Sequence, residues 1–350
     1  MKHLQKIIDA YLKNNIPFAV FKYPNAKPTI IAQYSTNFII DKVDLKKTGF
    51  LIHPFIKDKK TPIAFIKPDV FTIDFDTINL SNLPHFNKQQ FIYNEKVIDF
   101  PSYKKTLQKQ LNLLQTNVLQ KVIASRIVEL AKIEQSVLAR KFEQLCIQNP
   151  NAFCYVFNLP GIGLWLGASP EILLQYENNV AKTVALAGTK KIEKAETWGA
   201  KEIEEQQYVG SYIENICDNL SLQIINKSET ETINAGTIQH LKTSYHIKIE
   251  KENVLALVEA LHPTPAVAGL PKQKAIQVIL ESESYDRQYY TGYLGMIEAN
   301  KIQLQVNLRC AKLSEHNTLA FVGGGITKNS DIEKEWDETV AKSGTIASIM

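Results

Sequence analysis

Cysteine is scarce in this chain, and the few cysteines present show no metal-binding or redox spacing. The 350 residues contain four, Cys146, Cys154, Cys217 and Cys310, with no C-x-x-C pair among them. Their spacing argues against a zinc ribbon, a thioredoxin-type motif and a disulfide scaffold. We therefore expect free thiols in a reducing compartment.

A large excess of charge of one sign is also missing, as is any long apolar run. The 40 Lys and Arg against 36 Asp and Glu give a formal net charge of +4, too little to favour nucleic acid or an anionic membrane as partner. Asn158, Pro160 and three glycines interrupt the most apolar stretch, residues 152–168, so it cannot form a membrane-spanning helix. The charged N-terminus lacks the apolar core of a secretory signal. These absences predict a cytoplasmic protein with no membrane contact.

Hydrophobic residues make up 45% of the chain, enough for a large core, and no repeat or Gly/Ser linker divides it. Apolar residues at helical spacing predict helices over about 3–14, 102–117, 136–148, 196–220, 252–261, 271–280 and 330–343. Short runs rich in β-branched and aromatic residues predict strands at 17–22, 29–34, 49–55, 61–68, 121–130, 152–157, 163–168, 171–176, 180–187, 239–249, 291–298 and 302–313. The pattern predicts a single α+β domain over 1–350, in which residues 1–100 form a β-rich part.

Two Glu-x-x-Glu spacings fall on two of the predicted helices. Glu202 and Glu205 share one face of the first, and that face continues into apolar residues; Glu335 and Glu338 repeat the spacing on the last helix. Carboxylates that face a core need a partner, and two converging pairs would suit a hard cation such as Mg²⁺. Solvated surface helices with ordinary charge patterning would give the same spacing.

Other residues are candidates for anion binding. The segment FVGGGIT (321–327) places Gly323 and Gly325 directly after a predicted strand, where glycine N–H groups can hold an anion, although a tight turn alone explains them. Arg309 falls inside the predicted strand 302–313, where its planar fork suits a carboxylate of either a ligand or the protein.

Three further residues are candidates for proton transfer. Lys121 begins a predicted strand and could act as a base in a dry site, although strand-edge lysines are usually solvated. Glu171 follows a proline at the start of another strand, and His240 could be a polar core residue as easily as a catalytic one. None of these residues alone decides a function.

Taken in order, the segments resemble one family. They are KVIASR, LGASPE, LAGTK, KEIEEQ, QHL, HPTPAVAG, ESYDRQYYTG, NLRC, GGGI and EWDETVAK. Over about residues 118–345 this series resembles the chorismate-utilising enzymes, which include isochorismate, salicylate and anthranilate synthases. The resemblance implies a single large domain with two mostly antiparallel β-sheets sandwiched between helices.

The resemblance also implies a substrate and a cofactor. The substrate would be chorismate, bound with Mg²⁺ by Glu205 and Glu338, with Glu202 and Glu335 beside them. The remaining residues that the resemblance places around the substrate are Gly188, Thr189, His240, Ala266, Val267, Tyr290, Arg309, Gly323, Gly325 and Lys342. One departure is Gln206, where many members have histidine. Family members occur as monomers and homodimers, and we expect one of these states here.

The family's reactions differ in the nucleophile that attacks ring carbon C2. Members that add ammonia usually have glutamine where this chain has Lys121, whereas members that add water have lysine. Lys121 is therefore expected to be the base that activates water, and Glu171 the acid that protonates the departing C4 hydroxyl. The HPTPA segment is typical of isochorismate synthases, for menaquinone or catecholate siderophore synthesis. The alternatives are a salicylate synthase, which also eliminates pyruvate, and a non-catalytic anion-binding module on the same fold.

Overall fold

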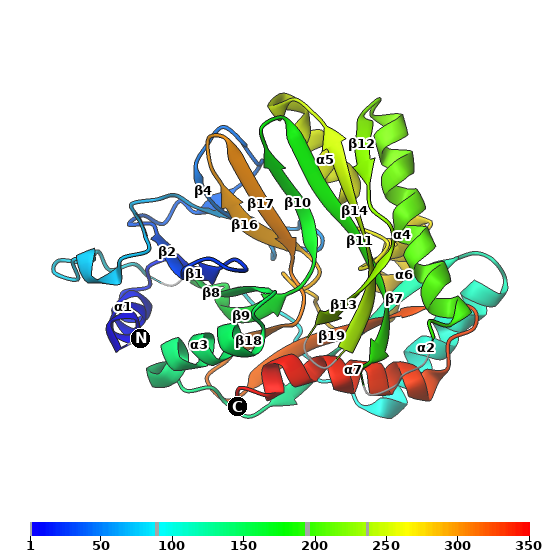
Figure 1. Cartoon of the computed structure of the whole chain (residues 1–350). Helices are drawn as coiled ribbons and strands as arrows, with labels where there is room; N and C mark the ends of the chain where they lie inside the picture. Colours follow the sequence, from blue (N-terminus) through cyan, green and yellow to red (C-terminus); the bar gives the residue numbers. More distant parts are fainter. Residues whose placement is uncertain (1, 88–90, 193–196, 236–237) are drawn as a thin grey trace.

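Two large antiparallel β-sheets face each other in the computed structural model, which describes residues 2–87, 91–192, 197–235 and 238–350 (Figure 1). The first sheet has the strand order β15 (Gly269–Leu270), β7 (Lys121–Leu130), β19 (Thr318–Ile326), β18 (Cys310–Leu313), β9 (Gly163–Ser169), β8 (Phe153–Leu159), β1 (Phe18–Lys22), β2 (Thr29–Ala32) and β6 (Val70–Thr72). This sheet supplies the base of the candidate site.

The second sheet has the order β12 (Gln223–Lys227), β14 (Ile238–Lys248), β11 (Val180–Lys191), β10 (Ile172–Glu177), β17 (Lys301–Val306), β16 (Tyr293–Ile297), β4 (Gly49–His53), β5 (Ile63–Ile66) and β3 (Ile39–Ile40). A further strand, β13 (Glu231–Ala235), pairs with β14. The fold class predicted from the resemblance is confirmed. The first hundred residues complete both sheets, because β1 pairs with β8 and β4 pairs with β16.

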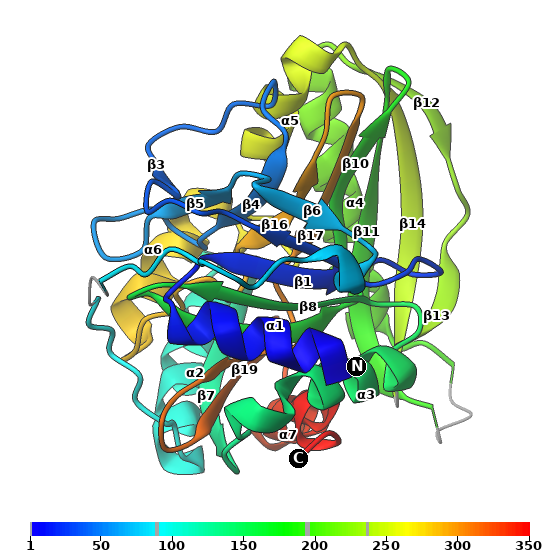
Figure 2. The same ribbon diagram turned by 90° about the vertical axis from the view of Figure 1, so that its left-hand side faces the viewer.

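Helices cover the outer faces of both sheets. They are α1 (Lys2–Lys13), α2 (Phe100–Gln115), α3 (Leu138–Gln148), α4 (Ala200–Asn219), α5 (Val254–Leu261), α6 (Lys272–Ser282) and α7 (Ile332–Ala347). Apolar residues of α4 and α5 pack on the second sheet, and those of α1 and α3 pack on the first, where the two helices lie side by side (Figure 2). In the described part of the chain, no helix is both long and apolar enough to cross a membrane.

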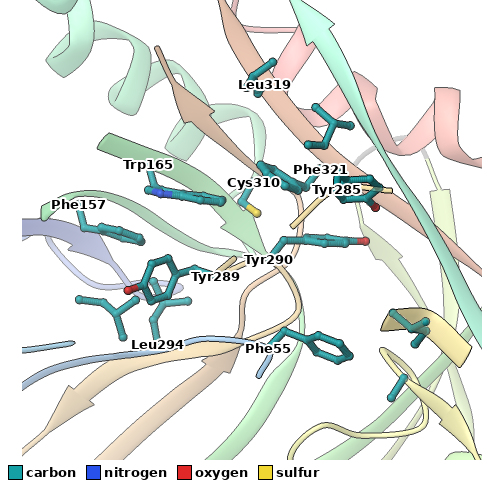
Figure 3. Packing of buried hydrophobic residues seen from close by; sticks show 14 of the residues in the cluster. Phe55, Phe157, Trp165, Tyr285, Tyr289, Tyr290, Leu294, Cys310, Leu319 and Phe321 are labelled. Atoms are coloured by element: carbon teal, nitrogen blue, oxygen red, sulfur yellow. The ribbon is translucent and has the colours of Figure 1, made fainter. Parts of the chain in front are cut away.

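The core between the sheets is rich in aromatic rings, which lead toward the candidate site. Trp165 stacks on Phe321 with ring centroids 5.1 Å apart, and Phe321 stacks on Tyr290 at 5.7 Å (Figure 3). Burying large rings is strongly stabilising, and stacked rings fix one another's orientation. Tyr290 and Phe321 are therefore held rigidly where they line the cavity described below.

Side-chain caps fix where two of the helices begin. Asp99 accepts a hydrogen bond from the amide of Ser102 at the start of α2, and Asp331 accepts one from Lys334 at the start of α7. Arg126 of β7 anchors α7, because its guanidinium lies 3.7 Å above the Trp336 ring and its Nε donates to Thr339. These contacts set the height of Glu335 and Glu338 above the first sheet.

Strands β3, β6 and β15 were not predicted, and four further sequence predictions differ from the structure. The predicted strand 302–313 is two strands, β17 and β18, in different sheets, so Arg309 lies at a break and not inside a strand. Gly323 and Gly325 lie within β19 and pair with β7, so they are not in a loop after a strand. Strands β12 and β13 were not predicted. The predicted helix 196–220 begins at Ala200; residue 196 lies outside the described residues.

Candidate active site

A cavity of about 80 Å³ lies where the two sheets meet, and it gathers nearly all of the predicted site residues. Those that line it are Lys121, Glu171, Gly188, Thr189, Glu205, His240, Ala266, Val267, Tyr290, Arg309, Gly323, Gly325, Glu338 and Lys342. Glu202 and Glu335 are not among the lining residues. Distant segments thus converge on one site, as the family resemblance required.

Two crossovers between the sheets carry Glu171 and Arg309 into the cavity. Glu171 stands between β9 and β10, and Arg309 between β17 and β18. The crossovers are hydrogen-bonded to each other, because the amide of Val306 donates to the Glu171 carbonyl and that of Ala168 to the Arg309 carbonyl. Arg309 has a φ of 49°, a left-handed conformation uncommon outside glycine and asparagine. Backbone strain of this kind is characteristic of functional sites.

Glu171 is a buried carboxyl group that holds a proton at neutral pH. Its residue is 4% exposed, and burial raises the pKa of Glu171 to about 8, although the positive charges of Lys121 and Lys342 oppose this rise. A carboxylic acid of this kind can donate a proton to a leaving group near pH 7.

Lys121 is also buried and lies opposite a carboxylate. It is 1% exposed at the first position of β7, and its Nζ lies 3.5 Å from Oε2 of Glu205 on α4. A cavity-facing amine with no solvent around it can exchange a proton with a bound molecule rather than with bulk water. Lys121 and Glu171 therefore bring an amine and a carboxyl group to the same small space.

His240 connects a β-bulge in β11 to Arg309 through two hydrogen bonds. The register of β11 against β14 shifts between Ala187 and Thr189, and Gly188 has a φ of 71° there. The Gly188 carbonyl lies 2.9 Å from Nδ1 of His240, and Nε2 of that ring lies 2.9 Å from Nη2 of Arg309. Burial, together with the charge of Arg309, lowers the pKa of His240 to about 3. The ring is therefore neutral.

Gln206 fixes the same bulge from α4. Its side chain accepts from the Ala187 amide and donates to the Ala185 carbonyl and to the Thr243 hydroxyl. These bonds satisfy the buried amide fully on the backbone of β11 and on β14. Gln206, which stands where many family members have histidine, therefore supports the wall of the site without lining the cavity.

Glycines form the wall of the cavity beside Lys121. Gly323, Gly324 and Gly325 pair with Ser125, Ala124 and Ile123 of β7. A Cβ added at Gly325 would lie 2.9 Å from Cε of Lys121 and 3.0 Å from Oε2 of Glu205. Glycine therefore allows both groups to approach the strand.

Lysine side chains form ion pairs with the carboxylates of α4 and α7. Lys201 lies 2.6 Å from Oε1 of Glu335 and 3.5 Å from Oε1 of Glu205, and Lys342 lies 2.8 Å from Oε1 of Glu338. Burial, and then the charge of Glu338, raises the pKa of Glu335 to about 7. Burial opposes a fall in the pKa of Glu338, but Lys342 and Lys201 hold that pKa below its usual value.

These carboxylates are the donors available to Mg²⁺. Oε2 of Glu335 is buried and accepts no hydrogen bond within the described chain, and it would lie 3.1 Å from a Cβ at Gly324. Glu205 and Glu338 bring further carboxylate oxygens to neighbouring glycines. As the side chains stand, the described residues contain no group of three or more His, Cys, Asp or Glu arranged around one metal position. The donor chemistry suits a hard cation, provided that the lysines release the carboxylates.

Glu202 takes a different position. Its Oε2 would lie 2.6 Å from a Cβ at Gly199, the residue that precedes α4. A carboxylate there interacts favourably with the positive end of the helix.

The sequence interpretation overlooked Lys201, although it stands four residues before Glu205 in the same helix. The sequence also gave no indication of how small the cavity is. Cavities that hold small molecules usually measure about 300–1,000 Å³. A cavity of about 80 Å³ is smaller, so binding a substrate requires its long polar side chains to move.

Comparisons with known proteins agree with this geometry. A family model described as chorismate binding enzyme matches residues 45–350. The vibriobactin-specific isochorismate synthase of Vibrio cholerae is 31% identical over 315 residues, covering 85% of this chain and 78% of that protein. Isochorismate synthase EntC of Escherichia coli is 31% identical over 263 residues, covering 71% and 66%.

Solved structures show the same fold. MenF, the menaquinone-specific isochorismate synthase of Escherichia coli, superposes with a TM-score of 0.76 at 19% identity, covering 95% of this chain and 88% of that one. Anthranilate synthase component I of Streptococcus pneumoniae gives 0.64 at 17% identity, covering 94% and 90%. The family match covers most strands of both sheets and every residue that lines the cavity, and the chain belongs to the chorismate-binding enzyme family.

Proposed function

We propose that this chain is an isochorismate synthase, which converts chorismate reversibly into isochorismate. The observation that carries the proposal is that Lys121 and a protonated Glu171 line one cavity from different strands. Relatives named for vibriobactin and for menaquinone share this product, which supports the assignment.

In the proposed reaction, water adds to ring carbon C2 as the hydroxyl at C4 leaves. Lys121 accepts the proton of the attacking water, and Glu171 donates its proton to the departing hydroxyl, which leaves as water. The ring double bonds shift, and the two proton transfers balance, so the net change is an isomerisation. Each proton transfer contributes roughly 10²–10⁴-fold to the rate.

The carboxylates of the substrate would meet the cationic side of the cavity. Arg309, fixed by His240, offers planar donors to the enolpyruvyl carboxylate, beside Tyr290 and the glycine wall. Mg²⁺, held by Glu205 and Glu338 with Glu335 beside them, would supply positive charge to the ring carboxylate. Gly188, Thr189, Ala266 and Val267 complete the walls.

Product analysis tests the proposal. The full chain is incubated with chorismate and Mg²⁺, and the products are separated by liquid chromatography, with an EDTA-treated sample alongside. We expect an equilibrium mixture of chorismate and isochorismate that does not form in EDTA. Salicylate and pyruvate as main products would indicate a salicylate synthase. Chorismate binding without turnover would indicate a non-catalytic module.

A further inference from the structure

Lys201 joins the two helices that carry the proposed metal ligands. It lies in the first turn of α4, and its Nζ reaches Glu335 on α7 at 2.6 Å and Glu205 at 3.5 Å. We propose that Lys201 is an internal counter-ion, which holds these carboxylates when no divalent cation is bound and competes with the cation for them. This inference rests on the proposed Mg²⁺ site.

Burying the carboxylates of α4 and α7 carries a cost in free energy. Glu205 and Glu335 are 7% and 2% exposed, and a buried carboxylate without a positive partner is strongly destabilising. Lys121 contacts Glu205, and Lys342 contacts Glu338. Among the ion pairs of the described residues, the pair between Lys201 and Glu335 alone links α4 to α7. Lys201 therefore keeps the two helices together in the metal-free state.

Lys201 compensates the Glu335 carboxylate only in part. Lys201 contacts one oxygen of Glu335, whereas Oε2 is buried and without a hydrogen-bond donor in the described chain. As placed, the Lys201 ammonium bonds Oε1 of Glu335, lies 3.5 Å from Glu205 and leaves Oε2 of Glu335 unbonded. A divalent cation carries twice the charge and binds carboxylate oxygens at about 2.0–2.1 Å when it is Mg²⁺.

The Lys201 ammonium and a divalent cation exclude each other from these carboxylates. An ammonium 2.6 Å from Oε1 of Glu335 repels a second cation bound to the same carboxylate. The Lys201 side chain is 22% exposed, so it has a path to solvent when the carboxylates turn to a metal ion. A divalent cation therefore binds these carboxylates only when Lys201 releases them, so the two events are coupled.

Removing the charge of Lys201 tests this exchange. Lys201→Met keeps the length of the side chain, and Mg²⁺ affinity is measured by titration calorimetry on the full chain without substrate. We expect Lys201→Met to bind Mg²⁺ about tenfold more tightly than the wild type, within the usual range for coupled binding events. In EDTA the variant should melt at a lower temperature than the wild type, and Mg²⁺ should close the gap.

The matched control is Lys227→Met. Lys227 also pairs with a glutamate of α4, Glu214 at 2.7 Å, but lies away from the cavity. It should leave Mg²⁺ affinity unchanged. Lys201→Arg keeps the positive charge and should show no gain in affinity, which provides a second test should Lys201→Met not fold.

The outcomes separate the two proposals. If the wild type binds Mg²⁺ and Lys201→Met binds it equally or more weakly, the counter-ion role is wrong and the metal site stands. A gain in affinity with Lys201→Arg would also overturn the counter-ion role. If neither wild type nor Lys201→Met binds Mg²⁺, the proposed metal site itself fails.

Discussion

Nη2 of Arg309 donates a hydrogen bond to Nε2 of His240 across 2.9 Å. Because an arginine only donates, Nε2 of the ring is unprotonated, and Nδ1 carries the proton that bonds to the Gly188 carbonyl. The ring is a fixed acceptor, and it aims the guanidinium into the cavity.

His240→Leu should therefore weaken substrate binding without changing the ionisation of the site. A hydrogen bond to a charged group contributes about 1.5–3 kcal/mol, so we expect KM for chorismate to rise at least about tenfold. Because the pKa of His240 is about 3, the dependence of kcat/KM on pH between 5 and 7 should not change. The measurement is kcat and KM across pH, with His246→Leu on the same strand as control. An ionisation in this range that the wild type shows and His240→Leu lacks would contradict the neutral ring.

Glu171→Gln should lower kcat by roughly 10²–10⁴-fold while the protein stays folded, because it removes the transferable proton. In the wild type, kcat should fall as pH rises through about 8, the pKa of Glu171. Glu177→Gln, an exposed position on β10, is the control and should keep wild-type rates. Full activity in Glu171→Gln would exclude the acid role.

Glu171 should also make stability depend on pH. The folded chain keeps a proton that the unfolded chain loses near the ordinary pKa of 4.5. The free energy of unfolding therefore decreases as pH rises from about 4.5 to about 8. Denaturant titrations at several pH values should show this slope in the wild type and a smaller one in Glu171→Gln. Equal slopes would mean that the carboxyl group is not protonated when folded.

Lys121→Gln should abolish water addition at C2, because the amide cannot accept a proton. We expect a loss of roughly 10²–10⁴-fold in isochorismate formation, with circular dichroism unchanged. Lys248→Gln, at an exposed position on β14, serves as control. Isochorismate formed at the wild-type rate by Lys121→Gln would rule out Lys121 as the base.

Two glycine substitutions should separate stability from activity. A Cβ at Gly323 would lie 2.7 Å from the carbonyl oxygen of Ala124, which the sheet holds fixed, so Gly323→Ala should cost about 1–3 kcal/mol of unfolding free energy. At Gly325 the Cβ meets the flexible ends of Lys121 and Glu205. Gly325→Ala should therefore lower kcat about 10²-fold with a smaller loss of stability. Denaturant unfolding and kinetics on both variants measure this, and the reverse ranking would refute it.

Much of the fold could be predicted from local patterns, since helical periodicity placed α1 and α2 within a few residues. The break between β17 and β18 could not be predicted, because the residues on both sides of it are apolar and have the pattern of a strand. Arg309 adopts its left-handed φ through tertiary bonds and not through a turn residue. Strands β12 and β13 are largely exposed and polar, so the apolar runs that mark other strands are absent there.

The candidate site was predicted from motif order, because spacing alone left every residue ambiguous. Spacing could place Glu202 and Glu205 on one helix face but could not show that Glu202 turns back to the helix start. Lys201 was missed since a lysine beside two glutamates normally indicates a solvated helix, and its burial depends on α7, which is more than a hundred residues later.

The three glycines at 323–325 limit the substitutions that this enzyme can accept during evolution. A new side chain would meet the backbone of β7 at Gly323, Glu335 and Glu338 at Gly324, and Lys121 and Glu205 at Gly325. Natural selection therefore cannot change the product of this enzyme by adding side chains at these glycines. A descendant that made a different compound would have to acquire its changes on the facing loop, around Ala266 and Val267, where side chains already border the same space.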